Sequence, residues 1–398
     1  MRRCAWPRTR NRNWRRAGLA QCVIVVFIML ASGCQPSSQS VATPRPAATS
    51  MPRAAATLSA SRQQLIQPEQ NSTPAPRSSL STGPVEFAAQ IHGCGSQPPA
   101  EAIELVAQAG FAWVKQQVRW DEIEGVRGAY AWKCIDDVVD LAHARNLKVL
   151  LSVTTAPRWA RTWTAGEPGP PDADLLAAFL INMATRYKSK LHAVEVFNEP
   201  NLSVEWGDNL NPGYYVQMLI AASQAIKRVD PNIMVISAGL APTRWNDWGA
   251  AIDDLEYMRL IGRDAAYYAD CIGAHFNDGT SSPRVPGSLL EQLVTGYRQL
   301  ASKSKPICLT EFGIATPVNG RTPRGFQWAA RTTPEQQAQW LADGVRWAKA
   351  HPGLVRLVVV WNLNYFSDNS DPNSLYSLWT PTGMRPAYEA LRAVLKER

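Results

Sequence analysis

Histidine is scarce in this chain, with five scattered examples among 398 residues. Neither an HExxH pair nor two closely spaced cysteines of the kind that bind zinc occurs. A glycine-rich phosphate-binding turn is also missing, because Gly93 and Gly95 do not extend into a dinucleotide fingerprint. We therefore predict that the protein binds neither a metal ion nor an organic cofactor.

The first 84 residues lack lysine and contain a single acidic residue, Glu69, against eleven arginines. The remainder holds thirty basic and thirty-two acidic residues, so the net charge of +8 belongs to the N-terminal segment. A nearly neutral remainder gives no sign of a nucleic-acid-binding surface. We expect no nucleic-acid partner.

Residues 1–34 resemble an export signal. An arginine-rich start is followed by an uncharged, largely apolar run that ends in LASGC at Cys34. The small residues before this cysteine are similar to a bacterial lipobox, in which the cysteine is lipidated. The alternative is an uncleaved membrane anchor, because the run has about the length of a minimal spanning helix. Either interpretation places the rest of the chain outside the cytoplasm, on the cell surface or secreted.

Residues 35–84 contain few large apolar residues and are rich in Pro, Ser, Thr and Ala. Such a segment cannot bury enough surface to offset its ordering entropy, so we predict a disordered tether. Four cysteines fall beyond it. Cys94 and Cys134 are predicted at the same rim of the fold, where a disulfide suits an oxidising compartment. Cys271 and Cys308 lie in apolar strands and are interpreted as buried thiols.

From residue 85 onward, apolar runs typical of strands alternate with segments of helical spacing. Eight strands are expected, at 86–93, 112–120, 148–157, 193–199, 233–242, 271–278, 307–313 and 355–366. Each is followed by a helix; Thr333 and Pro334 mark the start of one of them as a cap and first residue. Eight strand–helix repeats predict a single α/β domain over residues 85–398, a (β/α)8 barrel. An open doubly wound sheet is the alternative.

Polar and aromatic residues gather where these strands end, which is where the active sites of such barrels lie. The fourth strand ends in FNEPN, with Asn198 and Glu199, and the seventh in TEFG, with Glu311. A lone glutamate at a strand end is usually a surface or ion-paired residue. Two glutamates on the fourth and seventh strands, with Arg119 on the second, favour catalysis.

These motifs, with VRW on the second strand, APRWA after the third, His275 on the sixth and Trp361 on the eighth, resemble the retaining glycoside hydrolases of clan A. The resemblance covers residues 86–398 and is strongest to family 39-like enzymes, followed by family 5 cellulases. It implies that Glu199 is the acid/base, Glu311 the nucleophile, Asn198 a contact to the sugar 2-hydroxyl, and Arg119 a neighbour of Glu311. Phe276 departs from the tyrosine of several relatives, so a hydroxyl partner for the nucleophile must come from elsewhere or be absent.

A retaining mechanism needs one ionised and one protonated carboxyl group. We expect Arg119 to lower the pKa of Glu311 and burial to raise that of Glu199. Because both Asn198 and Glu199 are assigned to one substrate, the end of the fourth strand should bulge or twist. Lys115 and Glu195, each four residues before a site residue, are expected to form a buried ion pair beneath the site.

Further substrate contacts are predicted at the rim. His92 and His275 either hydrogen-bond locally or contact substrate, and Asn364 lies at the end of the eighth strand. Indole rings in the rim loops can stack on sugar rings, Trp361 and Trp159 first. The candidates are Trp159, Trp163, Trp206, Trp245, Trp248 and Trp361.

Together these observations predict a monomeric glycosidase that cleaves a polysaccharide or oligosaccharide by double displacement. The many rim aromatics favour an extended substrate and endo action. A non-catalytic carbohydrate-binding protein on the same barrel is the alternative from another class, and transglycosylation is the alternative within the class. The sequence does not choose the sugar or the linkage.

Overall fold

The computed structural model describes residues 83–95, 98–162, 168–368 and 370–397. The predicted signal at 1–34, with Cys34, lies outside these residues, as do most of the predicted tether at 35–84 and Trp163. Among the residues described, no helix combines the length and apolar character needed to span a membrane.

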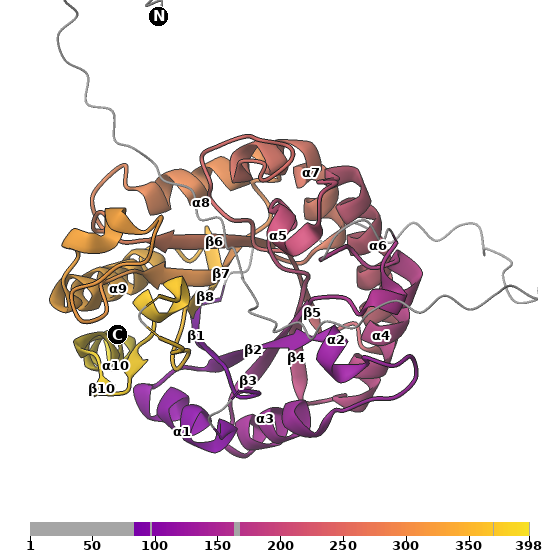
Figure 1. Ribbon diagram of the computed structural model, residues 1–398, viewed down its shortest axis with the longest axis horizontal. Helices are drawn as coiled ribbons and strands as arrows, with labels where there is room; N and C mark the ends of the chain where they lie inside the picture. Colours follow the sequence, from indigo (N-terminus) through magenta and orange to yellow (C-terminus); the bar gives the residue numbers. More distant parts are fainter. Residues whose placement is uncertain (1–82, 96–97, 163–167, 369, 398) are drawn as a thin grey trace, which may run out of the picture. The chain divides into compact units, whose positions relative to one another are not determined.

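Eight parallel strands form the centre of the described part of the chain (Figure 1). They are β1 (Glu86–Ile91), β2 (Trp113–Arg119), β3 (Lys148–Thr154), β4 (Leu191–Val196), β5 (Met234–Ser237), β6 (Ile272–Asp278), β7 (Ile307–Ile314) and β8 (Val355–Val360). Their order is β5-β4-β3-β2-β1-β8-β7-β6. A parallel bridge from Ile236 to Cys271 joins the two ends of this sheet. The predicted (β/α)8 barrel is therefore confirmed.

Helices surround the strands. They are α1 (Pro99–Ala109), α2 (Trp120–Ile123), α3 (Lys133–Ala144), α4 (Ala173–Arg186), α5 (Ser203–Trp206), α6 (Pro212–Val229), α7 (Asp254–Tyr268), α8 (Leu289–Leu300), α9 (Pro334–Lys349) and α10 (Pro386–Lys396). Short 3-10 turns lie at Arg158–Ala160, Gln327–Arg331 and Pro372–Leu375, and β9 (Trp379–Thr380) pairs antiparallel with β10 (Gly383–Met384).

Local sequence explains where α9 begins and how closely it packs against β7. The predicted start of α9 is confirmed: Thr333 and Gln336 form a reciprocal capping box, and Pro334 is the first helical residue. In the same helix, a side chain at Gly344 would place its Cβ 2.1 Å from the Phe312 ring of β7. Only glycine lets α9 approach the strand that carries Glu311 so closely.

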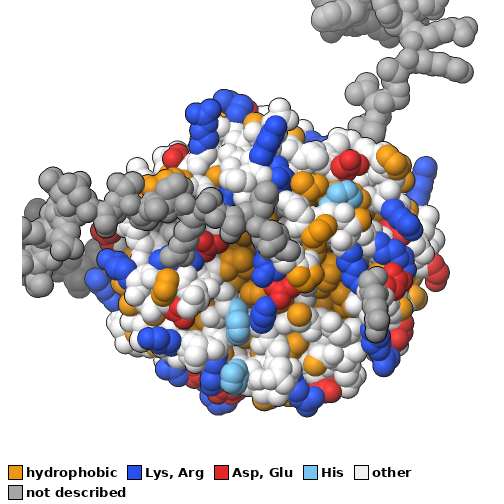
Figure 2. Space-filling model, turned by 180° about the vertical axis from the view of Figure 1, so that it is seen from behind, with side chains coloured by type: hydrophobic (Ala, Val, Ile, Leu, Met, Phe, Trp, Pro, Cys, Tyr) orange, Lys and Arg blue, Asp and Glu red, His pale blue; other side chains and the backbone are white. Residues whose placement is uncertain are grey.

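Two apolar cores result. The larger lies between strands and helices. The smaller fills the barrel interior and includes Ala88, Trp113, Leu150, Ala193 and Leu357. On the face shown in Figure 2, Lys and Arg side chains are interspersed with Asp and Glu around the periphery.

Both pairs of domain cysteines are joined. Cys94 and Cys134 form the disulfide that the sequence left open, and it ties the segment after β1 to the start of α3. The prediction of buried thiols at Cys271 and Cys308 was wrong, because these residues also form a disulfide. Cys271 immediately precedes β6 and Cys308 lies in the neighbouring strand β7. The register of these strands aligns Gly273 with Cys308, and this brings the two sulfurs together inside the barrel.

Candidate active site

The segment after β4 carries Asn198 and Glu199 and leaves the strand geometry abruptly. β4 ends at Val196, and Phe197 and Glu199 have φ angles of 75° and 37°, in the left-handed region. This agrees with the predicted twist at the end of the strand. The Glu199 N–H donates to the Gly239 carbonyl at 3.1 Å, which anchors the turn to the segment after β5.

Glu311 lies within β7, a strand buried along its whole length. The register with β8 shifts between Leu309 and Phe312, so the strand is irregular at this glutamate. Its side chain is 6% exposed, and its Oε2 accepts a 3.0 Å hydrogen bond from the Asn277 amide. Position 276 carries a phenylalanine without a hydroxyl group, and the amide of Asn277, the next residue of β6, donates to Glu311 instead. Sequence reasoning missed Asn277, although it shares the strand face of His275.

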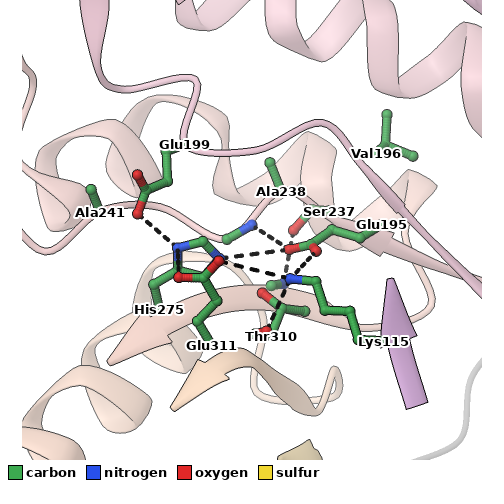
Figure 3. A network of polar contacts seen from close by, with 12 residues as sticks. Lys115, Glu195, Val196, Glu199, Ser237, Ala238, Ala241, His275, Thr310 and Glu311 are labelled. Carbon is green, nitrogen blue, oxygen red and sulfur yellow. Dashed lines mark hydrogen bonds and ion pairs between the residues drawn. The ribbon is translucent and has the colours of Figure 1, made fainter. Parts of the chain in front are cut away.

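His275 connects the two predicted catalytic glutamates (Figure 3). Its Nδ1 lies 2.8 Å from Glu199 Oε1 and 3.5 Å from Glu311 Oε2. Its Nε2 lies 3.8 Å from Glu195 Oε1. Gly239 makes room for this fully buried ring, because a Cβ there would be 2.1 Å from His275 Cδ2. The prediction that His275 belongs to the site is consistent with this position between the carboxylates.

The predicted ion pair beneath the site is confirmed. Lys115 Nζ lies 2.8 Å from Glu195 Oε2, and both side chains are fully buried. The same Nζ donates to the Thr310 carbonyl at 3.0 Å and lies 4.0 Å from Glu311 Oε1. Lys115 is thus the cation that β2 supplies to Glu311.

Arg119 does not take that position, and its expected place beside Glu311 was wrong. It is the last residue of β2, its side chain is 47% exposed, and it pairs with Asp121 and Glu122 of α2. The expected lowering of the pKa of Glu311 was wrong as well. Burial raises the pKa of Glu311, Glu199 adds to this, and the opposing effects of His275 and Lys115 do not outweigh them.

The charges of His275 and Glu195 depend on the charged groups close to them. Burial opposes charging of the His275 ring, but Glu311, Glu195 and Glu199 together raise its pKa to about 10. Burial likewise opposes ionisation of Glu195, yet Lys115 and His275 lower its pKa well below the ordinary value. The His275 ring is therefore charged at neutral pH, with the carboxyl groups of Glu195, Glu199 and Glu311 around it.

One oxygen each from Glu199 and Glu311 and one ring nitrogen of His275 lie within 4.8 Å of one another, close enough to surround a metal ion. Metal binding would require the His275 ring to lose its proton, which the raised pKa of this histidine opposes. The imidazolium itself supplies the positive charge between the two carboxylates.

A second group of predicted residues lies at the ends of β1 and β8. The backbone N–H of His92 donates to Asn364 Oδ1 at 2.9 Å. The His92 ring meets that of Trp361 edge-on, with the ring centroids 5.5 Å apart. Burial and, less strongly, Lys115 lower the pKa of His92 to about 3, so this histidine is neutral. Trp361 is 7% exposed. Sugar contacts by these three residues stay predictions.

Two further predicted sugar contacts, Trp159 and Trp206, lie in different environments. Trp159 is partly buried, and its Nε1 donates to the Glu124 carbonyl at 2.9 Å, which fixes the ring on the α2 side of the rim. Trp206 is fully buried among Phe197, Tyr214 and Tyr215, so its assignment to substrate binding was wrong. The single turn of α5 points its ring into the core.

An eight-stranded parallel barrel with one buried and one partly buried glutamate, bridged by a histidine at its strand ends, defines a glycosidase-type site. The sequence profile of the cellulase family, glycosyl hydrolase family 5, matches residues 78–367. The chain belongs to this family, a member of clan A and the second of the two resemblances inferred from the sequence. No match was found among curated protein sequences.

Solved structures share the fold. A family 39 glycoside hydrolase from the gut symbiont Bacteroides cellulosilyticus WH2 superposes with a TM-score of 0.58 at 17% identity, covering 78% of this chain and 63% of that one. GH5_18 from Streptomyces cattleya, in complex with GlcNAc, superposes with a TM-score of 0.59 at 16% identity, covering 79% of this chain and 80% of that one. XacCel5A, in complex with cellopentaose, superposes with a TM-score of 0.55 at 13% identity, covering 78% of this chain and 99% of that one. This chain therefore spans less than two thirds of the family 39 structure.

Proposed function

We propose that the protein hydrolyses glycosidic bonds of a polysaccharide or oligosaccharide with retention of configuration. One carboxyl oxygen of Glu199 lies within 4.8 Å of one of Glu311. Retaining enzymes hold the two carboxyl groups about 5 to 5.5 Å apart, whereas inverting enzymes need about 6.5 to 9.5 Å for an intervening water. The close approach of these two oxygens leaves no room between them for the water of an inverting enzyme, and it is the observation that carries the proposal.

Glu311 is the proposed nucleophile. Lys115 and the Asn277 amide stabilise its ionised form on the side toward β2 and β6. Glu199, on the turn after β4, protonates the leaving oxygen and then activates water. His275, between the two, hydrogen-bonds Glu199 and interacts with the charge on Glu311 before the glycosyl–enzyme bond forms.

The test is hydrolysis of aryl glycosides and polysaccharides by the full chain, with Glu311→Gln as the inactive control. Glu311→Ala should lose nearly all activity and form a glycosyl azide of inverted configuration when azide is added, because the anion replaces the missing carboxylate. Glu199→Ala should keep more activity on substrates with good leaving groups and give the retained azide product. Exchanged stereochemistries would overturn the roles, and binding without hydrolysis would favour the carbohydrate-binding alternative.

We also propose an extracytoplasmic location, with attachment through Cys34 or an uncleaved anchor, and endo action on an extended chain. The disulfides Cys94–Cys134 and Cys271–Cys308 support an oxidising compartment. Metabolic labelling with a fatty acid, compared between the native chain and Cys34→Ala, tests lipidation. Product lengths released early from a soluble polysaccharide distinguish endo from exo action.

A further inference from the structure

A second cluster of aromatic side chains lies away from the catalytic carboxyl groups, on the loop that precedes α3. Tyr130 and Trp132 stack with their ring planes 12° apart and their centroids 5.6 Å apart. Trp132 stacks in turn on Phe179 of α4, at 5.5 Å and 18°, and is only 8% exposed. Tyr130 is 38% exposed. Because one face of the Tyr130 ring covers Trp132, the opposite face is turned to solvent.

The orientation of the exposed Tyr130 ring is fixed at two places. The side-chain amide of Asn182, on α4, donates to the Tyr130 hydroxyl at 2.7 Å. Trp132 supports the ring from below, and the guanidinium of Arg186 lies 5.9 Å from the centroid of that indole. A side chain that is already ordered loses little conformational entropy when a ligand binds to it. The free face of Tyr130 is therefore a preorganised contact surface.

The Tyr130 ring borders a shallow surface cavity of about 550 Å³ between α3 and α4. The residues that line it are Tyr130, Ala131, Trp132, Lys133, Asp136 and Arg186. Arg186 donates to both carboxylate oxygens of Asp136, at 2.6 and 2.7 Å. Lys133 donates to Asp137 at 2.7 Å. The cavity thus combines a flat apolar ring with ordered polar groups, and its positive and negative charges cancel.

The chemistry of this cavity favours one class of ligand. An anionic polymer would gain little, because the cations that it would contact are already paired with carboxylates. A neutral sugar presents C–H groups on the face of its ring, which pack on an aromatic face, and hydroxyl groups around its edge, which hydrogen-bond to charged groups. A neutral glycan chain is therefore the ligand that matches both features of the cavity.

We propose that the cavity between α3 and α4 is a second carbohydrate-binding site, which holds a neutral stretch of a polysaccharide on the outside of the barrel. The inference rests on the proposed function for the identity of the ligand, which is the polysaccharide that the active site cleaves. Two sites that bind one polymer raise its apparent affinity, because the second contact is intramolecular. Tyr130 is the central contact of this site and takes no part in bond cleavage.

Affinity electrophoresis of the full chain carrying Glu311→Gln measures binding without hydrolysis. The gels contain a neutral polysaccharide, either mixed-linkage β-glucan, arabinoxylan or galactomannan, or polygalacturonate as an anionic comparison. With at least one neutral polysaccharide, we expect Tyr130→Ala and Tyr130→Leu each to weaken binding about tenfold, because the flat ring is lost. Tyr130→Leu keeps an apolar side chain over Trp132 and so preserves the fold if Tyr130→Ala does not.

The matched control is Tyr267→Ala, which removes a 46% exposed tyrosine from α7, across the barrel from α3 (Figure 1). It should bind like the parent protein. No binding of any neutral polysaccharide, tighter binding of polygalacturonate, or an equal loss in Tyr267→Ala would overturn the proposal. Glu311-dependent hydrolysis with unchanged binding in the folded Tyr130 variants would overturn this inference alone. Tyr130-dependent binding by a protein that hydrolyses no glycoside would support the second site and overturn the proposed catalytic function.

Discussion

The interior of the barrel changes character along its axis. Toward the strand starts it is apolar, with Ala88, Trp113, Leu150 and Ala193 packed around the Cys271–Cys308 disulfide. Two residues further along the same strands, on the same face, stand Gln90, Lys115, Ser152 and Glu195, all fully buried. One end of the interior is held by packing and a covalent bond, and the other by paired charges.

The charged end of the interior serves the active site rather than the stability of the fold. Buried ion pairs contribute little net stability compared with apolar packing, because both charges must be desolvated. The charged end is retained because Lys115 and Glu195 hold His275 and Glu311 in place at the site. Perturbing each end should therefore have separable effects on stability and activity.

The largest effect is expected from Glu195→Leu. This change leaves the Lys115 ammonium buried without its carboxylate, which should cost about 3 to 5 kcal/mol of unfolding free energy. The double variant Lys115→Met/Glu195→Leu should recover much of that stability while remaining nearly inactive. Chemical denaturation and glycoside hydrolysis measure the two outcomes. Equal stability of wild type and Glu195→Leu would show that the pair is not energetically coupled.

The second largest effect is expected at the apolar end of the barrel interior. Replacing Cys271 and Cys308 together by alanine removes a crosslink between residues 37 apart in sequence, which should cost about 4 kcal/mol of unfolding free energy. Activity at 25 °C should stay near wild type, because these residues lie away from the carboxylates. Denaturation of oxidised protein measures the stability, and a large fall in activity would argue against the independence of the two ends.

How far the site could be foreseen from sequence depended on local geometry. Glu199, Glu311 and the Lys115–Glu195 pair were placed correctly, because strand order and the alternation of side chains along a strand fix them. Arg119 was not, because the strand ends there and its side chain turns outward to α2. Trp206 was misassigned because a single helical turn decides which way its ring points.

The electrostatics could not be read from sequence. The pKa of Glu311 depends on the balance between its burial and the charges of His275, Lys115 and Glu199, which only the three-dimensional arrangement gives. Similarly, the pairing of Cys271 with Cys308 depends on the register between β6 and β7. Residue type alone was consistent with buried thiols.

A pH-dependent effect, smaller for each pH unit than the two effects above, is expected at His275. Its pKa rises from 6.5 in the unfolded chain to about 10 in the folded protein, so its stabilisation is complete below about pH 6.5 and is lost as the pH approaches 10. Unfolding free energy should fall by up to about 1.4 kcal/mol per pH unit between these values. Urea denaturation at several pH values checks this, and His275→Gln should show a flatter dependence. The same slope in both proteins would contradict a charged His275.

The smallest effect is expected from Asn277→Ala, which removes one hydrogen bond at the charged end. The Asn277 amide donates to Glu311 Oε2 and lowers the pKa of that carboxyl group against the effect of burial. Without it the pKa of Glu311 should rise further, so the acidic limb of the kcat/KM profile should move to higher pH. Loss of one hydrogen bond to a charged group corresponds to about tenfold in kcat/KM on the acidic side. Asn232→Ala, at an exposed turn, is the matched control. A uniform loss at all pH values, with no movement of the acidic limb, would mean that Asn277 acts on substrate binding and leaves the ionisation of Glu311 unchanged.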